Sequence, residues 1–236
     1  KGTIVGSFDF LDNYMIRGES SDAIPKLYIR DLKTNKEEEI KISNEQIGSP
    51  GASLMQRDTN TTKIRIGWES MATQGKVYEY DILTKKKKLV KEVEIPSGHD
   101  PDKYIVERLK AKSHDGRMIP ITLVRRKDIK LNGKSKMVLY AYGAYKHSVD
   151  VSFSSSRFCL VDRGITFAIA HIRGGGEMGE HWHKEALFEL KKNSFLDYIA
   201  CANHLIKQKY TYKGGICFLG GSAGGLTGSA VANMSP

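Results

Sequence analysis

The sequence predicts a chain of two parts, an all-β part over residues 1–98 and an α/β part over residues 99–236. Short alternating segments separated by turn-forming residues fill the first part. In the second part, near-continuous apolar strands alternate with helical patterns, which is typical of a sheet covered on both faces. Residues 96–102 are polar, rich in turn formers and bracketed by prolines, so we place the domain boundary there.

The all-β part contains an internal repeat with a spacing of 50 residues. Residues 27–36 return as residues 77–86, and the matching pairs are Tyr28 and Tyr78, Asp31 and Asp81, and Thr34 and Thr84. This period suits propeller blades of four strands. Two copies are fewer than a closed propeller needs, so we expect the last blades of a larger β-propeller. A meander of two similar hairpins is the alternative. The lysine run at 85–88 is expected on a solvated outer strand.

A hairpin and three buried strands are predicted in the α/β part. The hairpin pairs residues 104–111 with residues 118–125 across an Asp-Gly turn. Apolar runs predict strands at 137–142, 165–172 and 216–219. This combination predicts a partial sheet of the α/β-hydrolase type.

Two helices are predicted between these strands. A helix near residues 158–162 is expected to end at Gly164. Asn193 or Ser194 is expected to cap the second helix, with Asp197 in its first turn. The predicted apolar face of the second helix consists of Phe195, Ile199, Ala202 and Ile206.

The strand at 216–219 runs into Gly-Gly-Ser-Ala-Gly-Gly, and a helix is predicted at 226–234. A strand, a G-x-S-x-G turn and a helix form the nucleophile elbow of α/β hydrolases. Ser222 is expected in a strained conformation that exposes its hydroxyl, and side chains at Gly220, Gly224 or Gly225 are expected to collide there. The helix N-terminus favours a developing oxyanion. A glycine-rich turn without chemistry is the alternative.

Composition is that of an ordinary globular chain, with 40% hydrophobic and 27% charged residues. The net charge is +10, but the basic residues are mostly scattered, so nucleic-acid binding is not expected. No apolar run is long enough to span a membrane, and membrane association is not expected. The three cysteines lack metal spacing and predict reduced, buried thiols and a cytoplasmic location.

Two weaker motifs point to ligands but lack the required context. Residues 174–179 match G-x-G-x-x-G after a strand. A dinucleotide site also needs an acidic residue about 20 residues further on, at the end of the next strand, but here that residue falls in a predicted helix. A wide loop beside the active site is therefore expected instead of a dinucleotide site. His181 and His183 lie about 200° apart on a helix, and no cysteine or carboxylate cluster accompanies them. No metal and no cofactor are expected.

Several motifs follow one another in a fixed order. They are Tyr-Ala-Tyr-Gly-Ala-Tyr at 140–145, Ser-Phe-Ser-Ser-Ser-Arg at 152–157, Val-Asp-Arg-Gly at 161–164, His-Ile-Arg-Gly-Gly-Gly-Glu-Met-Gly at 171–179, Lys-Asn-Ser-Phe-Leu-Asp at 192–197, and the elbow around Ser222. Together they resemble the prolyl oligopeptidase family of serine peptidases, and within it the oligopeptidase B group is the most similar. The resemblance is strong over residues 100–236 and implies a β-propeller lid on an α/β-hydrolase domain.

The resemblance also implies roles for individual residues. Ser222 is the nucleophile, while the Tyr142 hydroxyl and the Ala223 backbone N–H are the two donors to the oxyanion, each worth on the order of 3 kcal/mol. Asp150 falls where oligopeptidase B has an acid thought to bind a basic substrate residue. Arg173 and Glu177 are further candidate substrate contacts.

Three positions depart from the family pattern. Ser152 stands where a second acid is expected, which argues against tight recognition of two basic residues. Ala141 replaces a glycine. Residues 183–187 lack the aromatic-acidic pattern of the family, so the nearby loop is expected to differ.

The implied activity is that of a serine endopeptidase or oligopeptidase that cleaves short peptides after Arg or Lys through an acyl-enzyme. In this fold the triad Asp and His follow the nucleophile, and none of the 14 residues after Ser222 is either. We therefore expect a fragment that is inactive alone. A non-catalytic interaction protein on the same fold and an esterase with the same elbow are the alternatives, and no oligomeric state is predicted.

Overall fold

The computed structural model describes residues 3–53 and 59–236. The chain divides into two compact units, one of Lys1–His99 with Val151–Phe153 and the other of Asp100–Asp150 with Ser154–Pro236. The division after His99 lies next to the boundary expected from the sequence, whereas the return of Val151–Phe153 to the first unit was not expected. In the described part of the chain, no helix has the length and apolarity needed to cross a membrane.

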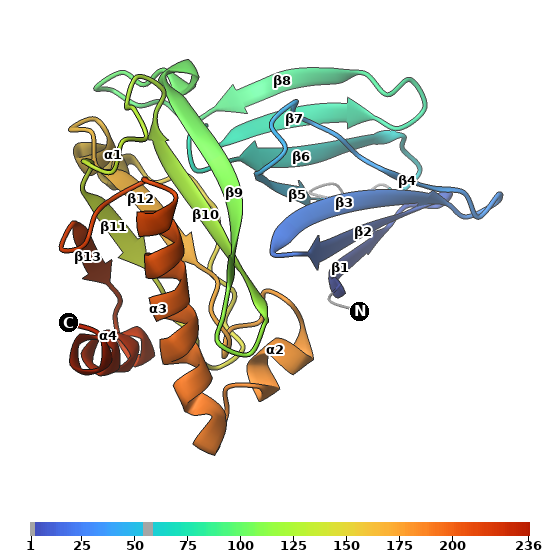
Figure 1. Cartoon of the computed structure of the whole chain (residues 1–236). Helices are drawn as coiled ribbons and strands as arrows, with labels where there is room; N and C mark the ends of the chain where they lie inside the picture. The colour runs from blue at the N-terminus through green and yellow to red at the C-terminus, as the bar shows by residue number, and fades with distance from the viewer. Residues whose placement is uncertain (1–2, 54–58) are drawn as a thin grey trace. The chain divides into compact units, whose positions relative to one another are not determined.

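The first unit consists of two four-stranded antiparallel sheets (Figure 1). One sheet comprises β1 Thr3–Phe10, β2 Tyr14–Ser21, β3 Ile24–Asp31 and β4 Glu37–Glu39. The other comprises β5 Ser49–Ser53, β6 Lys63–Glu69, β7 Lys76–Asp81 and β8 Lys87–Glu92. Each strand pairs with its neighbour in sequence, which is the pattern of a propeller blade. The two sheets share one core, in which Ile16, Ile29, Ile64 and Ile66 are buried.

The repeat with a spacing of 50 residues builds the same turn twice. Asp31 accepts the backbone N–H of Thr34 at 2.8 Å, and Asp81 accepts that of Thr84 at 2.8 Å. The residue after each threonine has a positive φ, 58° in one copy and 57° in the other. These bonds lower the pKa of both aspartates below the ordinary value. The sequence repeat is thus a repeat of backbone geometry as well.

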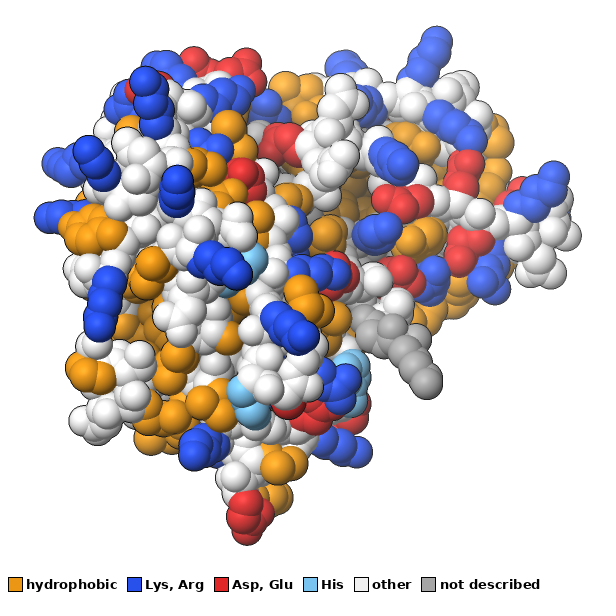
Figure 2. Space-filling model, viewed as in Figure 1, with side chains coloured by type: hydrophobic (Ala, Val, Ile, Leu, Met, Phe, Trp, Pro, Cys, Tyr) orange, Lys and Arg blue, Asp and Glu red, His pale blue; other side chains and the backbone are white. Residues whose placement is uncertain are grey.

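The lysine run lies at the turn into β8 and within it. β8 is the edge strand of its sheet and is exposed along its whole length, which confirms the predicted solvated strand. On the face shown in Figure 2, Lys and Arg side chains are scattered, with Asp and Glu between them. Arg17–Glu37 and Lys85–Glu38 are two of the ion pairs of the first unit.

The second unit contains a five-stranded sheet in the order β13-β11-β12-β10-β9. Its strands are β9 Tyr104–Lys112, β10 Met118–Arg126, β11 Met137–Tyr140, β12 Thr166–Ala170 and β13 Ile216–Leu219. β9, β10 and β12 pair antiparallel, whereas β12, β11 and β13 pair parallel. The predicted hairpin and the positions of the three predicted strands are confirmed, and two of those strands are shorter than predicted. The predicted burial of the strand at 216–219 is wrong, because β13 lies at the edge of the sheet and leaves Cys217 and Leu219 exposed.

Helices cover both faces of this sheet (Figure 1). They are α1 Ser155–Val161, α2 Glu180–Lys184, α3 Lys192–Lys207 and α4 Ala223–Met234, with 3₁₀ turns η1 Pro101–Lys103 and η2 Phe188–Lys191. α1 packs on one face, where the Arg157 guanidinium lies 4.6 Å from the Phe167 ring centroid. α3 packs on the other face, where the Tyr198 hydroxyl donates to the Leu139 carbonyl at 3.2 Å.

The start and the buried face of α3 differ from the prediction. The helix begins at Lys192, and no side chain caps it, so the predicted cap at Asn193 or Ser194 is wrong. The buried residues are Ser194, Asp197, Tyr198, Cys201 and Leu205, whereas Phe195, Ile199, Ala202 and Ile206 are only partly buried. Ser194 and Asp197 turn inward because they bind Arg173. Apolar periodicity cannot identify a buried face that carries a carboxylate.

The cysteines also differ from the prediction. All three are free, but only Cys201 is buried, while Cys159 and Cys217 are exposed. Burial raises the pKa of the Cys201 thiol well above its ordinary value. Cys201 therefore packs as a small apolar residue.

Candidate active site

Ser222 lies between β13 and α4 with φ 52° and ψ −122°. Residues other than glycine rarely adopt this conformation, which costs of order 1–3 kcal/mol. The residue is exposed, and its side chain does not cap α4. In the described part of the chain, no residue forms a hydrogen bond with the Ser222 hydroxyl. The hydroxyl is therefore available to react.

Two of the three glycines predicted to be essential have close neighbours. A Cβ at Gly224 would lie 2.8 Å from the Ala141 carbonyl oxygen, and a Cβ at Gly220 would lie 2.7 Å from the Phe218 ring. Both contacts are shorter than a side chain tolerates. Nothing lies within 4 Å of a Cβ at Gly225, so the predicted collision at that position is wrong. The nucleophile elbow thus requires glycine at Gly220 and Gly224, which lie against the sheet, but not at Gly225.

Tyr142 lies at the same edge of the sheet as Ser222. β11 and β13 pair in parallel with Tyr140 opposite Leu219, so the two chains leave the sheet side by side. A Cβ at Gly224 would lie 3.6 Å from the Tyr142 Cα, which shows how closely α4 approaches this backbone. The half-buried Tyr142 ring packs edge-on against His147, with ring centroids 5.2 Å apart.

Ala223 is the first residue of α4, and its N–H points out of the helix start. The first N–H groups of a helix have no acceptor within the helix. No acceptor for the Ala223 N–H occurs among residues 3–53 and 59–236. Ser222, Tyr142 and Ala223 thus all follow the carboxyl ends of the neighbouring parallel strands β13 and β11.

A glycine-rich loop supports the loop that follows Tyr142. Gly174 has φ 101°, and a Cβ there would lie 2.0 Å from the Gly143 carbonyl oxygen, so only glycine fits. No helix starts within residues 174–179, because α2 begins at Glu180. The predicted wide loop is present, and the geometry of a dinucleotide-binding turn is absent from this described segment.

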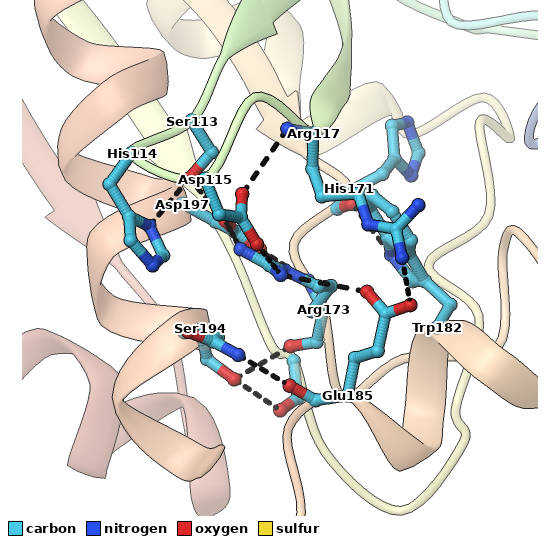
Figure 3. Close-up of polar contacts among 12 residues, drawn as sticks. Ser113, His114, Asp115, Arg117, His171, Arg173, Trp182, Glu185, Ser194 and Asp197 are labelled. Atoms are coloured by element: carbon cyan, nitrogen blue, oxygen red, sulfur yellow. Dashed lines mark hydrogen bonds and ion pairs between the residues drawn. The ribbon is translucent and has the colours of Figure 1, made fainter.

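Arg173 occupies the centre of a buried polar cluster (Figure 3). Its side chain is 1% exposed and donates to Asp197 from Nε at 2.8 Å and from Nη2 at 2.7 Å. Nη1 donates to Asp115 at 2.5 Å, and Ser113 donates to Asp197 at 2.6 Å. The predicted substrate contact of Arg173 is therefore not supported, because its donors are used inside the protein.

The charges of this cluster support one another. Burial alone would lower the pKa of Arg173, but hydrogen bonds to Asp197 and Asp115 raise it above the ordinary value. Burial alone would raise the pKa of Asp115, but the hydrogen bond from Arg173 lowers it. The cluster connects the β9–β10 turn, the end of β12 and α3. It holds the glycine-rich loop in place.

Glu177 is also buried, at 3% exposure. It accepts the Val149 N–H at 3.0 Å and lies 3.6 Å from His171 Nδ1. Its predicted substrate contact is not supported either, because the carboxylate ties one loop to the next. Asp150 is exposed on the loop after β11, so of the three candidate substrate residues it alone faces solvent.

The histidines of the His-Trp-His motif lie in α2. His183 Nδ1 is 2.9 Å from the Gly174 carbonyl oxygen and 3.1 Å from the Lys146 N, so it links the two loops. In the part of the chain that the structure describes, no three His, Cys, Asp or Glu side chains are grouped as metal ligands.

Four supporting residues were missed by sequence reasoning: Ser113, Asp115, Ser194 and Asp197. Asp115 was assigned only to a turn, and Ser194 only to a cap. Their contacts join segments far apart in sequence, for example Asp115 and Arg173. A single sequence gives no signal for such contacts.

A strained serine between a parallel strand and a helix defines a nucleophile elbow of the α/β-hydrolase class. Residues 151–236 match the model of the prolyl oligopeptidase family. Together with the relatives described next, this match confirms the resemblance seen in the motifs, and the chain belongs to the prolyl oligopeptidase family.

Two curated relatives and one solved structure illustrate the likeness. The chain is 38% identical over 98% of its length to dipeptidyl aminopeptidase BI of Pseudoxanthomonas mexicana, of which it covers 32%. It is 35% identical over 78% of its length to protease 2 of Moraxella lacunata, of which it covers 27%. Oligopeptidase B from Trypanosoma brucei matches 99% of the chain with a TM-score of 0.88 at 30% identity, over 34% of that structure. The chain thus spans about a third of the length of these relatives.

Proposed function

We propose that the protein acts as a serine peptidase that hydrolyses short peptides, with Ser222 as the nucleophile. The observation that carries this proposal is the backbone of Ser222, held at φ 52° with an unengaged hydroxyl between β13 and α4. The Tyr142 hydroxyl and the Ala223 N–H then stabilise the negative charge that develops on the attacked carbonyl oxygen.

In the proposed reaction, the Ser222 Oγ forms a bond to the carbonyl carbon while its proton passes to a general base. The tetrahedral intermediate expels the amine, which takes up that proton, and leaves an acyl-serine ester. Water then hydrolyses this ester and releases the carboxylic acid. In this class the acid and base follow the nucleophile in sequence, so an Asp and a His beyond Ser222 are the expected partners.

Cleavage after Arg or Lys is the finer part of the proposal. It is supported by the exposed carboxylate of Asp150 and by the likeness to oligopeptidase B, whose T. brucei structure carries covalently bound antipain. Ser152 supplies no second carboxylate two positions on. We therefore expect selection of one basic side chain and little preference for a pair.

Release of dipeptides is a second candidate mode, because a relative that matches 98% of the chain is a dipeptidyl aminopeptidase. The two modes are separated by their products. A peptide with an internal Arg and a blocked N-terminus is cut by an endopeptidase, whereas removal of two residues at a time requires a free N-terminus. Mass spectrometry of both digests distinguishes them.

The test of the proposed function uses the protein at its full natural length. A fluorophosphonate probe should label wild type at Ser222, and Ser222→Ala should lose both the label and the turnover of an Arg-containing peptide. Folded wild type that is not labelled would favour a non-catalytic interaction protein. Ser222-dependent turnover of simple esters with no turnover of any peptide would favour an esterase. A cytoplasmic location stays part of the proposal and is checked by cell fractionation.

A further inference from the structure

Lys191 ends the 3₁₀ turn η2 just before α3, and its ammonium group points into the protein. Nζ donates to the Gly143 carbonyl oxygen at 2.5 Å and to the Ser194 hydroxyl at 3.2 Å. The Phe195 ring lies beside it, with its centroid 5.9 Å from Nζ. Within the described residues, no carboxylate forms an ion pair with Lys191.

An ammonium group that lacks a carboxylate partner is costly to bury. Burial lowers the pKa of Lys191 below its ordinary value, which shows the same cost. The contacts that offset this cost are the carbonyl oxygen of Gly143, the Ser194 hydroxyl and the aromatic ring. Lys191 is therefore held by the loop after β11, and it holds that loop in turn.

Gly143 directly follows Tyr142 in the chain. Its φ is 68°, and its carbonyl oxygen is confined between the Lys191 ammonium and the backbone of Gly174. Ser194 completes this arrangement, because its hydroxyl donates to the Arg173 carbonyl oxygen at 2.6 Å. The peptide group between Gly143 and Ala144 thus has a fixed orientation, and it fixes the course of the chain one residue after Tyr142.

We propose that Lys191 is a positioning residue for Tyr142: by binding the Gly143 carbonyl oxygen, its ammonium group keeps the Tyr142 hydroxyl aimed at the oxyanion. This inference rests on the proposed function, in which Tyr142 is one of the two oxyanion donors. Lys191 itself touches neither the substrate nor the reacting atoms. Small displacements of a catalytic group can lower a rate by about 100-fold, so a positioning contact of this kind has a measurable effect.

The experiment compares Lys191→Met with Lys192→Met in the protein at its full natural length. Lys192 is the next residue, is exposed and serves as the matched control. We expect Lys191→Met to lower kcat for a peptide substrate by about 10- to 100-fold, with KM changed less than two-fold. Lys192→Met should behave as wild type. Active sites are counted with the fluorophosphonate probe, so that misfolded protein does not lower the apparent kcat.

A Tyr142→Phe background shows whether Lys191 acts through Tyr142. In that background the effect of Lys191→Met should fall to less than three-fold, because the hydroxyl to be positioned is gone. An equal effect in both backgrounds would overturn the proposal, as would a changed KM with unchanged kcat. If Lys191→Met does not fold, Lys191→Gln replaces it, and wild-type kcat in that variant would also overturn the proposal.

Crystal structures separate failure of this inference from failure of the proposed function. If wild type shows no Ser222-dependent turnover, the proposed function fails, but the position of the Gly143 peptide group can still be measured. We expect that peptide group and the Tyr142 ring to move in Lys191→Met and not in Lys192→Met. An unmoved Tyr142 ring in Lys191→Met would overturn the inference.

Discussion

Asp197→Asn is the substitution whose effect on stability follows most directly from the structure. Asp197 is fully buried and accepts four hydrogen bonds: from Arg173 N at 3.1 Å, Nε at 2.8 Å and Nη2 at 2.7 Å, and from Ser113 Oγ at 2.6 Å. An asparagine in this place loses the charge and turns an NH₂ group toward N–H donors. Arg173 then keeps its direct hydrogen bond to Asp115 and loses its buried counter-ion.

Removing one partner of a buried ion pair costs about 3–5 kcal/mol. In Asp197→Asn the buried Arg173 charge keeps, among the described residues, only the partly exposed carboxylates of Asp115 and Glu185 as partners. For a cooperative unit of 150–250 residues, this cost corresponds to a fall in Tm of about 6–20 °C. Thermal and urea unfolding, followed by circular dichroism on the full-length protein, measure the change. Asp128→Asn is the control, because Asp128 forms an exposed ion pair with Arg126.

The control should leave Tm unchanged within error, since exposed pairs contribute little. A Tm for Asp197→Asn within about 2 °C of wild type would refute the reasoning. It would mean that the cluster around Arg173 does not hold the loops together. Ser113→Ala removes only one of the hydrogen bonds to the Asp197 carboxylate. We expect its fall in Tm to lie between those of the other two variants.

Four further predictions follow from single contacts. Tyr142→Phe should lower kcat by about 10²–10³-fold with little change in KM, because one donor to the oxyanion is lost. Steady-state kinetics measure this, and an unchanged kcat would show that the hydroxyl has no catalytic role. Ser222→Gly should be more stable than Ser222→Ala by about 1 kcal/mol, because glycine relieves the strained backbone; equal urea midpoints would argue against the strain. Gly174→Ala should destabilise the protein by more than about 2 kcal/mol, whereas Gly225→Ala, with open space around the added methyl group, should stabilise it by up to about 1 kcal/mol; urea unfolding of the pair checks both. The pKa of Asp115 is lowered in the folded protein, so its contribution to stability is present above its unfolded pKa of about 3.9 and is lost as the pH falls through the lower folded pKa. Below about pH 4, the free energy of unfolding should therefore fall less steeply with decreasing pH in Asp115→Asn than in wild type. Parallel curves of unfolding free energy against pH would contradict this.

The parts of the fold that local patterns determine were predicted correctly. The Asp-Gly turn identified the β9–β10 hairpin, and the repeat of Asp-x-x-Thr identified two equal turns at Asp31 and Asp81. The strand and glycines around Ser222 predicted a strained serine, and the structure gives it a positive φ. In each case, residues close together in sequence specify the conformation.

The parts that depend on long-range polar contacts were not predicted. The buried face of α3 was misassigned because Ser194 and Asp197 are polar, yet they turn inward to meet Arg173. Arg173 and Glu177 were expected to contact substrate. The structure instead surrounds both side chains with partners from other loops, and no local pattern reveals such partners.

A crystal structure of the full-length protein after reaction with a fluorophosphonate would test the central claim most directly. The account predicts phosphorus bonded to the Ser222 Oγ, with Ser222 still at positive φ. It also predicts a phosphoryl oxygen about 2.7–3.1 Å from both the Ala223 N and the Tyr142 hydroxyl. A label on any other residue, or a phosphoryl oxygen directed away from both donors, would contradict it.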